Sequence, residues 1–150
     1  MAPTLSEGYE INTSPPSVQD YLALRQSSPT LTPINPSQAE AALHGSWHTI
    51  HITHQSDPSH AVAMGRIIGD GGWFFSIGDI VVLPSHQRKG LGDFIMSTLM
   101  EEIKKRAPKG APGAYVMLFA APGARGLYAR YGFRDTMPGN MGMAQWLEKD

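Results

Sequence analysis

The clearest pattern along the chain is a change of hydrophobic period after Gly90. From there, apolar residues recur every three or four positions, which is the period of a helix with one buried face. The positions on that face are Leu91, Phe94, Ile95, Leu99 and Ile103. Basic residues at positions 104–106 and a proline at position 108 are typical of a helix C-terminus. The pattern therefore predicts one long amphipathic helix that begins just after Gly90.

Before Gly90 the chain holds three longer runs of β-branched, aliphatic and aromatic residues, which predict strands. The runs are Trp47–Thr53, Ala61–Ile68 and Trp73–Leu83. Turn-forming residues at 56–59 and 70–72 separate them, so we expect an antiparallel meander. Gly78 interrupts the third run, and a glycine inside a strand is typical of a β-bulge.

Shorter segments complete the predicted order of elements. Ser17 and Ser37 stand where helices could begin, and the second helix would end near Gly45. The other predicted elements are strands at Tyr9–Thr13, Tyr115–Phe119 and Gly142–Leu147 and a helix at Gly123–Tyr131. This order predicts the α+β class, with a mixed, mostly antiparallel sheet flanked by helices. We expect a single domain over residues 9–150, after a flexible N-terminus at residues 1–8.

The charge balance and the cysteine count exclude several classes of function. The chain has 12 Lys and Arg against 13 Asp and Glu, whereas a nucleic-acid-binding domain is usually strongly basic, so we expect no nucleic-acid partner. Without cysteine, thiol nucleophiles and cysteine metal sites are excluded. No apolar run approaches the roughly 18 residues of a membrane span, and the first residues do not resemble a secretory signal. We therefore expect no membrane partner and a cytoplasmic location.

Three histidines in the first long strand are the candidate metal ligands. They are His48, His51 and His54. On a strand His51 would face away from the other two, and His48 and His54 would lie about 20 Å apart. We therefore expect no metal site.

The candidate chemistry lies in the segment that joins the third strand to the long helix. Gly90 and Gly92 lack a Cβ, so an anion could approach the backbone closely, and the first amides of a helix have no intrahelical partner. Arg88 and Lys89 add positive charge. The segment predicts a cradle for a phosphate or pyrophosphate; the alternative is an ordinary strand-to-helix turn with a solvated Arg-Lys pair. It lacks the sequence of a P-loop or of a dinucleotide-binding fingerprint.

Two motifs in this order resemble those of the GNAT N-acetyltransferases. The first is Q-x-x-G-x-G at Gln87–Gly92, and the second is A-x-x-x-Y-x-x-x-G-F at Ala124–Phe133. The resemblance implies a GNAT-like fold with a bulged, splayed central strand. It also implies acetyl transfer from acetyl-CoA, a cosubstrate, to a primary amine of a small molecule by direct attack in a ternary complex. Two alternatives are a non-catalytic acyl-CoA-binding module and an unrelated phosphate-binding protein.

The resemblance also implies which residues contact the cosubstrate. The pyrophosphate of CoA would lie on the loop amides of Arg88, Lys89, Gly90, Leu91, Gly92 and Asp93, and Gln87 would be a further cofactor-binding residue. The pantetheine arm would pair like an extra strand with the backbone of Ile80, Val81 and Val82. Ala121 stands where many family members have an asparagine that contacts the cofactor, so one hydrogen bond would be missing.

Tyr128 and Asp79 are the candidate catalytic residues. Tyr128 matches the tyrosine that lies beside the CoA sulfur and could protonate the leaving thiolate; the alternative is a tyrosine packed on a helix face. Asp79 stands where family members often carry an acid on this strand, but Gly78 replaces the Glu that often precedes it and holds a water. Either Asp79 takes the proton of the amine through water or a water chain carries that proton to solvent; the alternative role of Asp79 is a structural hydrogen bond at the bulge. Asp70 and Asp79 beside the aromatic run favour a cationic acceptor with an apolar body. A homodimer formed through the last strand is a further hypothesis.

Overall fold

The computed structural model describes residues 1–110 and 112–147. The chain divides into two compact units, Met1–Phe119 and Ala120–Asp150, and each is described by itself. Among the described residues, no helix combines the length and the apolar character needed to cross a membrane.

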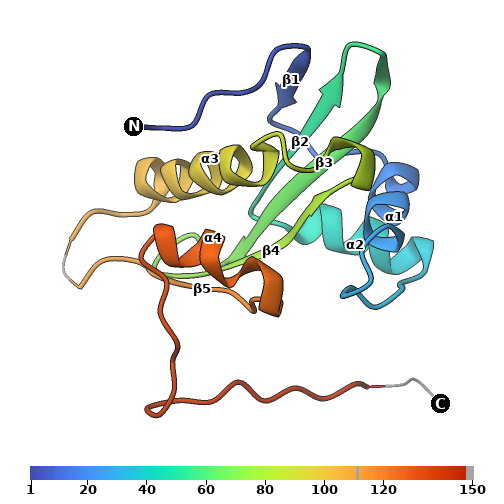
Figure 1. The fold of residues 1–150 in the computed structure, drawn as a ribbon. Coiled ribbons are helices and arrows are strands. Elements are labelled where there is room, and N and C mark those ends of the chain that lie inside the picture. The colour runs from blue at the N-terminus through green and yellow to red at the C-terminus, as the bar shows by residue number, and fades with distance from the viewer. Residues whose placement is uncertain (111, 148–150) are drawn as a thin grey trace. The chain divides into compact units, whose positions relative to one another are not determined.

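The first unit is built on a five-stranded sheet with the order β1-β2-β3-β4-β5 (Figure 1). The strands are β1 (Tyr9–Asn12), β2 (His48–His54), β3 (Asp57–Gly69), β4 (Phe74–Val82) and β5 (Tyr115–Met117). The first four pair antiparallel, and β5 pairs parallel to β4 after the chain crosses over through a helix. The predicted α+β class with a mixed, mostly antiparallel sheet is confirmed.

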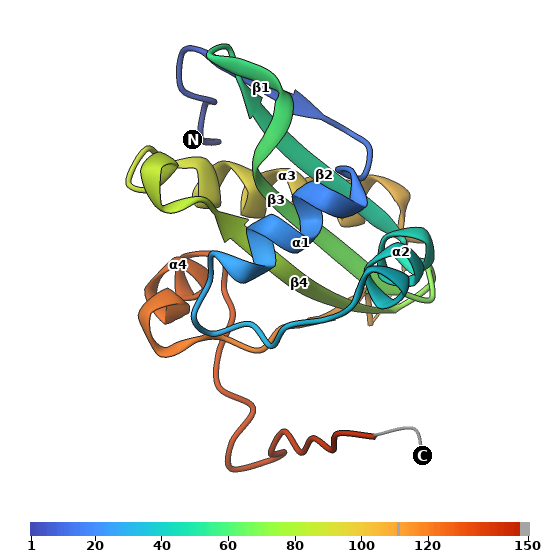
Figure 2. The ribbon, with the colours of Figure 1, turned by 90° about the vertical axis from the view of Figure 1, so that its right-hand side faces the viewer.

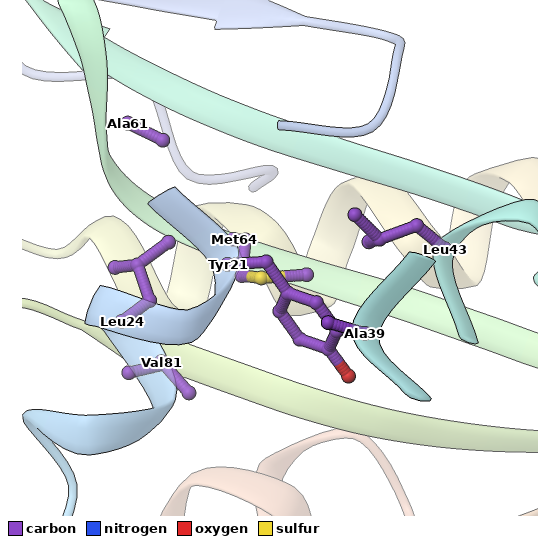
Figure 3. Close-up of a cluster of buried hydrophobic side chains, with 7 residues drawn as sticks. All are labelled: Tyr21, Leu24, Ala39, Leu43, Ala61, Met64 and Val81. Atoms are coloured by element: carbon purple, nitrogen blue, oxygen red, sulfur yellow. The ribbon is translucent and has the colours of Figure 1, made fainter. Parts of the chain in front are cut away.

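Helices cover both faces of this sheet. Helices α1 (Val18–Gln26) and α2 (Pro36–Gly45) lie on one face, and α3 (Leu91–Arg106) lies on the other (Figure 2). Under α1 and α2, a core cluster forms from side chains of both helices and the sheet (Figure 3). Its members are Tyr21, Leu24, Ala39, Leu43, Ala61, Met64 and Val81. This cluster fixes α1 directly over β3 and β4.

On the other face, Gly65 lets α3 pack closely against β3. A Cβ at this position would come within 2.5 Å of Ile95 Cγ2 and 3.0 Å of Leu99 Cδ1. Ile95 and Leu99 are fully buried, as the helical period predicted. Because real Cβ atoms do not approach that closely, glycine is required here for the observed distance between helix and sheet.

The helix starts follow local capping chemistry. Ser17 caps α1 by accepting a hydrogen bond from the Asp20 amide at 3.0 Å, as predicted. The second helix does not begin at Ser37, which was predicted to start it; Asn35 caps it. The Asn35 side chain accepts from the Gln38 amide and the Gln38 side chain from the Asn35 amide, so a complete capping box outweighs a single serine.

Two expectations about the strands are wrong. The predicted turn at 56–59 lies partly inside β3, which begins at Asp57 and pairs there with His54. The chain reverses at residues 55–56 instead, and Pro58 is tolerated because it lies near the start of the strand. The strand predicted at Tyr115–Phe119 ends at Met117, and Phe119 is exposed.

The second unit begins with a 3-10 turn at Pro122–Ala124 that leads into the short helix α4 (Arg125–Arg130). Gly132 follows with a φ of +86°, which is the left-handed conformation that commonly ends a helix. The last strand, predicted at Gly142–Leu147, is wrong: these residues have no regular secondary structure. A short, mostly apolar segment does not by itself make a strand, because the backbone also needs a neighbouring strand to pair with.

Candidate active site

The loop that follows β4 leaves open space in front of α3. We call residues Gln87–Asp93 the Gly90 loop. Arg88 and Gly90 have φ values of +62° and +77°, and α3 begins directly afterwards at Leu91. Gly90 is the N-cap residue and provides no side-chain hydrogen bond to the first amides of the helix. A Cβ at Gly90 would meet nothing within 4 Å, so an anion could reach these amides.

Hydrogen bonds from side chains of the first unit hold the Gly90 loop and the residue before it in place. Gln87 Nε2 donates to the Val82 carbonyl at 3.0 Å, which gives this predicted binding residue a structural role. The Ser6 hydroxyl donates to the Lys89 carbonyl at 2.8 Å, and the Tyr9 hydroxyl shares a 2.8 Å hydrogen bond with His86 Nδ1. Sequence reasoning missed Ser6 and Tyr9, because they lie 83 and 77 positions from their partners, Lys89 in the loop and His86 directly before it.

One edge of β4 is open next to this loop. The parallel pairing with β5 comprises Phe74 with Tyr115, Phe75 with Val116 and Ser76 with Met117. Beyond Ser76 no further β4–β5 pair occurs in the described part of the chain, although β4 continues to Val82. We call residues 77–82 on this side the open edge of β4. It includes the backbone of Ile80, Val81 and Val82, which was predicted to contact the pantetheine arm.

A β-bulge lies in the middle of the open edge. Met64 pairs with Val81 and Arg66 pairs with Gly78, so one residue of β3 faces two residues of β4. The two residues of β4 are Asp79 and Ile80, which face Gly65 of β3, and Asp79 has a φ of +51°. The predicted bulge next to Gly78 is confirmed.

Asp79 is held by three donors. Its carboxylate accepts hydrogen bonds from the Tyr21 hydroxyl at 2.5 Å, Arg25 Nη1 at 2.5 Å and Arg66 Nε at 2.7 Å. Only 6% of the Asp79 side chain is exposed. This arrangement favours the structural role that was the alternative to a general base.

The second carboxylate of the aromatic run is also engaged within the chain. Asp70 Oδ1 accepts hydrogen bonds from the amides of Gly72, Trp73 and Phe74, and these bonds lower the pKa of Asp70. Asp70 therefore fixes the turn between β3 and β4. Asp79 is paired with Arg25 and Arg66, so its charge is compensated within the chain. Asp70 keeps its negative charge, and the preference for a cationic acceptor stays a prediction.

Tyr128 and Ala121 lie in the second unit. Tyr128 is a half-buried residue of α4, and its ring lies edge-on to that of Phe133 with 6.4 Å between the centroids. Burial raises the pKa of Tyr128, so its hydroxyl keeps its proton at neutral pH. Ala121 precedes the 3-10 turn, and its carbonyl accepts from the Ala124 amide at 2.9 Å. The predicted site residues are thus divided between the two units. The Gly90 loop and the open edge of β4 belong to the first unit, and Tyr128 and Ala121 belong to the second.

The three histidines of β2 have separate partners. His48 Nδ1 accepts from Arg106, His51 Nδ1 bonds the Ser14 carbonyl at 2.7 Å, and His54 Nδ1 bonds the Ser56 hydroxyl at 2.7 Å. Burial lowers the pKa of His48. Within residues 1–110 and 112–147, no group of three or more His, Asp or Glu is arranged to hold a metal ion.

Comparison with known proteins identifies the family. The family model described as acetyltransferase (GNAT) domain matches residues 47–135, more than half of the chain. The chain therefore belongs to the GNAT acetyltransferases. A crystal structure of a protein of unknown function from methicillin-resistant Staphylococcus aureus, named a probable acetyltransferase, matches with a TM-score of 0.83 and 33% identity, covering 93% of this chain and 99% of that one.

Curated relatives match over shorter stretches. GCN5-related N-acetyltransferase 1, chloroplastic, of Arabidopsis thaliana is 37% identical over 82 residues, which are 55% of this chain and 39% of that protein. An uncharacterized N-acetyltransferase of Porphyra purpurea is 29% identical over 107 residues, which are 71% of this chain and 59% of that protein. The chain thus matches less than two thirds of the length of either relative.

Proposed function

We propose that this protein transfers the acetyl group of acetyl-CoA to a primary amine of a small molecule, by direct attack within a ternary complex. One observation carries the proposal. After the open edge of β4, only Leu83 and a 3-10 turn at Pro84–His86 precede the Gly90 loop, so an extended binding edge and an anion cradle follow one another closely along the backbone. Acetyl-CoA has the matching order of groups, with a pantetheine arm followed by a pyrophosphate.

The Gly90 loop would bind the pyrophosphate. The amides of Leu91, Gly92 and Asp93 open the first turn of α3, where the helix dipole favours negative charge. Arg88 and Lys89 add two positive charges to the loop. Gln87 would act indirectly, because its side chain is already bonded to the Val82 carbonyl.

The open edge of β4 would bind the pantetheine arm. An extended ligand with amide groups can add to an unpaired strand edge as a further strand would. The backbone of Ile80, Val81 and Val82 offers such an edge, because no β5 partner follows Ser76 within the described ranges. The Val82 carbonyl already accepts a hydrogen bond from Gln87, so at Val82 only the amide would be available to the arm. The alanine at position 121 would contribute no side-chain hydrogen bond to the cosubstrate.

The reaction needs two proton movements. The neutral amine nitrogen bonds to the thioester carbon while the carbon–sulfur bond breaks; the nitrogen then releases a proton and the CoA thiolate takes one up. We assign the second step to Tyr128, because a phenol hydroxyl is protonated at neutral pH and burial, which raises the pKa of Tyr128, keeps it so. Because Asp79 already accepts three hydrogen bonds, we propose that water, and not this carboxylate, accepts the proton released by the amine nitrogen.

Calorimetric titration and a thiol-release assay test the proposal. We expect the protein to bind CoA, and Arg88→Ala to raise the Kd about 10- to 150-fold, as for a lost hydrogen bond to a charged group. The effect should shrink as salt rises. Arg134→Ala, at an exposed arginine of the second unit, is the control and should leave the Kd unchanged. Release of thiol from acetyl-CoA with at least one amine of a panel would support acetyl transfer. If the protein bound CoA but released no thiol with any amine, the alternative of a non-catalytic acyl-CoA-binding module would be favoured instead.

A further inference from the structure

A buried cluster of charged side chains lies on the bulge of β4. Tyr21 and Arg25 come from α1, Arg66 comes from β3, and all three donate to the carboxylate of Asp79. We call these four residues the Asp79 cluster. Arg25 and Arg66 are only 12% and 14% exposed, so two nearly buried guanidinium groups face one nearly buried carboxylate. Such a cluster joins a helix and two strands at one point of the backbone.

The backbone at this point is unusual. Asp79 has a φ of +51°, in a region that residues other than glycine rarely adopt. The neighbouring residue is Gly78, which could adopt that conformation freely, yet the left-handed conformation falls on the aspartate. A conformation of this kind persists only where the surroundings hold it. Here the three hydrogen bonds to the Asp79 carboxylate hold the residue in this conformation.

The bulge also decides which way the binding edge faces. Ile80 points towards α3, because its Cγ1 lies 3.4 Å from where a Cβ of Gly65 would be, beside Ile95. Val81 points to the opposite face and packs in the cluster with Tyr21. If the extra residue were lost from the pairing, every side chain of this stretch would move to the other face of the sheet. The conformation of Asp79 therefore fixes the backbone that would contact the pantetheine arm.

We propose that Asp79 is a positioning residue for the acyl-CoA arm: Tyr21, Arg25 and Arg66 hold its carboxylate, and through it they keep the bulge and the open edge of β4 in the shape that binds the arm. This inference rests on the proposed function and makes it more specific. Burial, followed by the hydrogen bond to Asp79 and its charge, raises the pKa of Tyr21, so this hydroxyl remains a donor at neutral pH. Tyr21 is a core residue of α1 and is 0% exposed, which fits a residue that acts through Asp79 rather than on substrate.

Tyr21→Phe and Asp79→Asn are the test variants. Tyr21→Phe removes one donor and keeps the packed ring, and Asp79→Asn removes the charge but retains a side chain that tolerates a positive φ. We expect each to raise the KM for acetyl-CoA and the Kd for CoA about tenfold, as for the loss of one hydrogen bond to a charged group, with kcat changed less. The dependence of kcat on pH should keep its shape. Tyr115→Phe, at a half-exposed tyrosine of β5, is the matched control and should leave both constants unchanged.

Three results would overturn the inference. In the first, Asp79→Asn lowers kcat strongly and removes the acidic limb of the pH profile, while the Kd for CoA and the Tyr21→Phe enzyme stay normal; Asp79 would then be a general base. In the second, both variants bind and turn over like the wild type. In the third, amide hydrogen exchange at residues 78–82 is the same in Tyr21→Phe as in the wild type, so the cluster does not hold the bulge. The exchange measurement needs no ligand, so a wild type that fails to bind CoA would refute the proposed function separately.

Discussion

Replacing Gly90 with alanine isolates the contribution of the Gly90 loop to ligand binding. The added methyl group would project into open space in front of α3, where nothing else lies within 4 Å. The same space is where we place the pyrophosphate. The substitution should therefore act on the ligand far more than on the fold. Gly113 is a suitable control, because its φ is +88° and its Cβ would meet only the Gly110 carbonyl, at 3.8 Å.

The two effects of the substitution have different sizes. An L-residue forced into the left-handed region costs about 1–2 kcal/mol, and both alanine variants should carry this cost. For a chain of this length that corresponds to a fall in Tm of about 2–8 °C. Only Gly90→Ala should also lose a hydrogen bond between an amide and the phosphate, worth about 1.5–3 kcal/mol, which raises the Kd for CoA about 10- to 150-fold.

Thermal unfolding and calorimetric titration with CoA measure the two effects on the same samples. Gly90→Ala and Gly113→Ala should show similar losses of Tm, and only the first should lose affinity. A folded Gly90→Ala protein that binds CoA like the wild type would refute the assignment of the cradle. So would a Gly113→Ala protein that loses as much affinity, because the effect would then come from general destabilisation.

Three further predictions follow from individual contacts. Tyr128→Phe should lower kcat and kcat/KM together by about 10- to 100-fold with little change in KM, as for loss of a general acid, and steady-state kinetics would contradict this role if the variant were fully active. Gly65→Ala should lower stability by about 1–3 kcal/mol in a denaturant titration, because its Cβ would come within 2.5 Å of Ile95; an unchanged midpoint would show that α3 can move away. The pKa of His60 is raised by its hydrogen bond to Asp20, so the stabilisation is complete below the unfolded pKa of about 6.5 and disappears as pH rises through the folded pKa. His60→Ala should thus destabilise the protein at about pH 5.5 and have little effect at about pH 8.5; equal losses at both would contradict the ion pair.

The parts of the fold that could be predicted depend on local sequence. The helix beginning after Gly90 shows a clear period over four turns, and its buried positions include Leu99 and Ile103 as predicted. The start of α2 was misplaced, although Asn35 and Gln38 have the spacing of a capping box and could have been recognised. The strand at Gly142–Leu147 failed for another reason, because a strand depends on a partner that its own residues do not reveal.

The same distinction applies to the candidate site. The Gly90 loop could be predicted, because its glycines, its basic residues and the helix after it are contiguous. The partners of Asp79 could not, because Tyr21 and Arg25 lie 58 and 54 positions away along the chain. Only the packing of α1 over β4 brings them together. For this reason sequence reasoning left the role of Asp79 open between a base and a structural group.

The open edge of β4 has a consequence for solubility as well as for binding. Unpaired N–H and C=O groups on a strand can pair with a strand of another molecule, which is a common route to aggregation. The bulge at Asp79 limits this risk, because a bent, twisted edge cannot offer an uninterrupted ladder to a straight strand. An extended ligand that occupies the edge would remove the remaining exposure. The protein should therefore resist aggregation on mild heating better with CoA than without it.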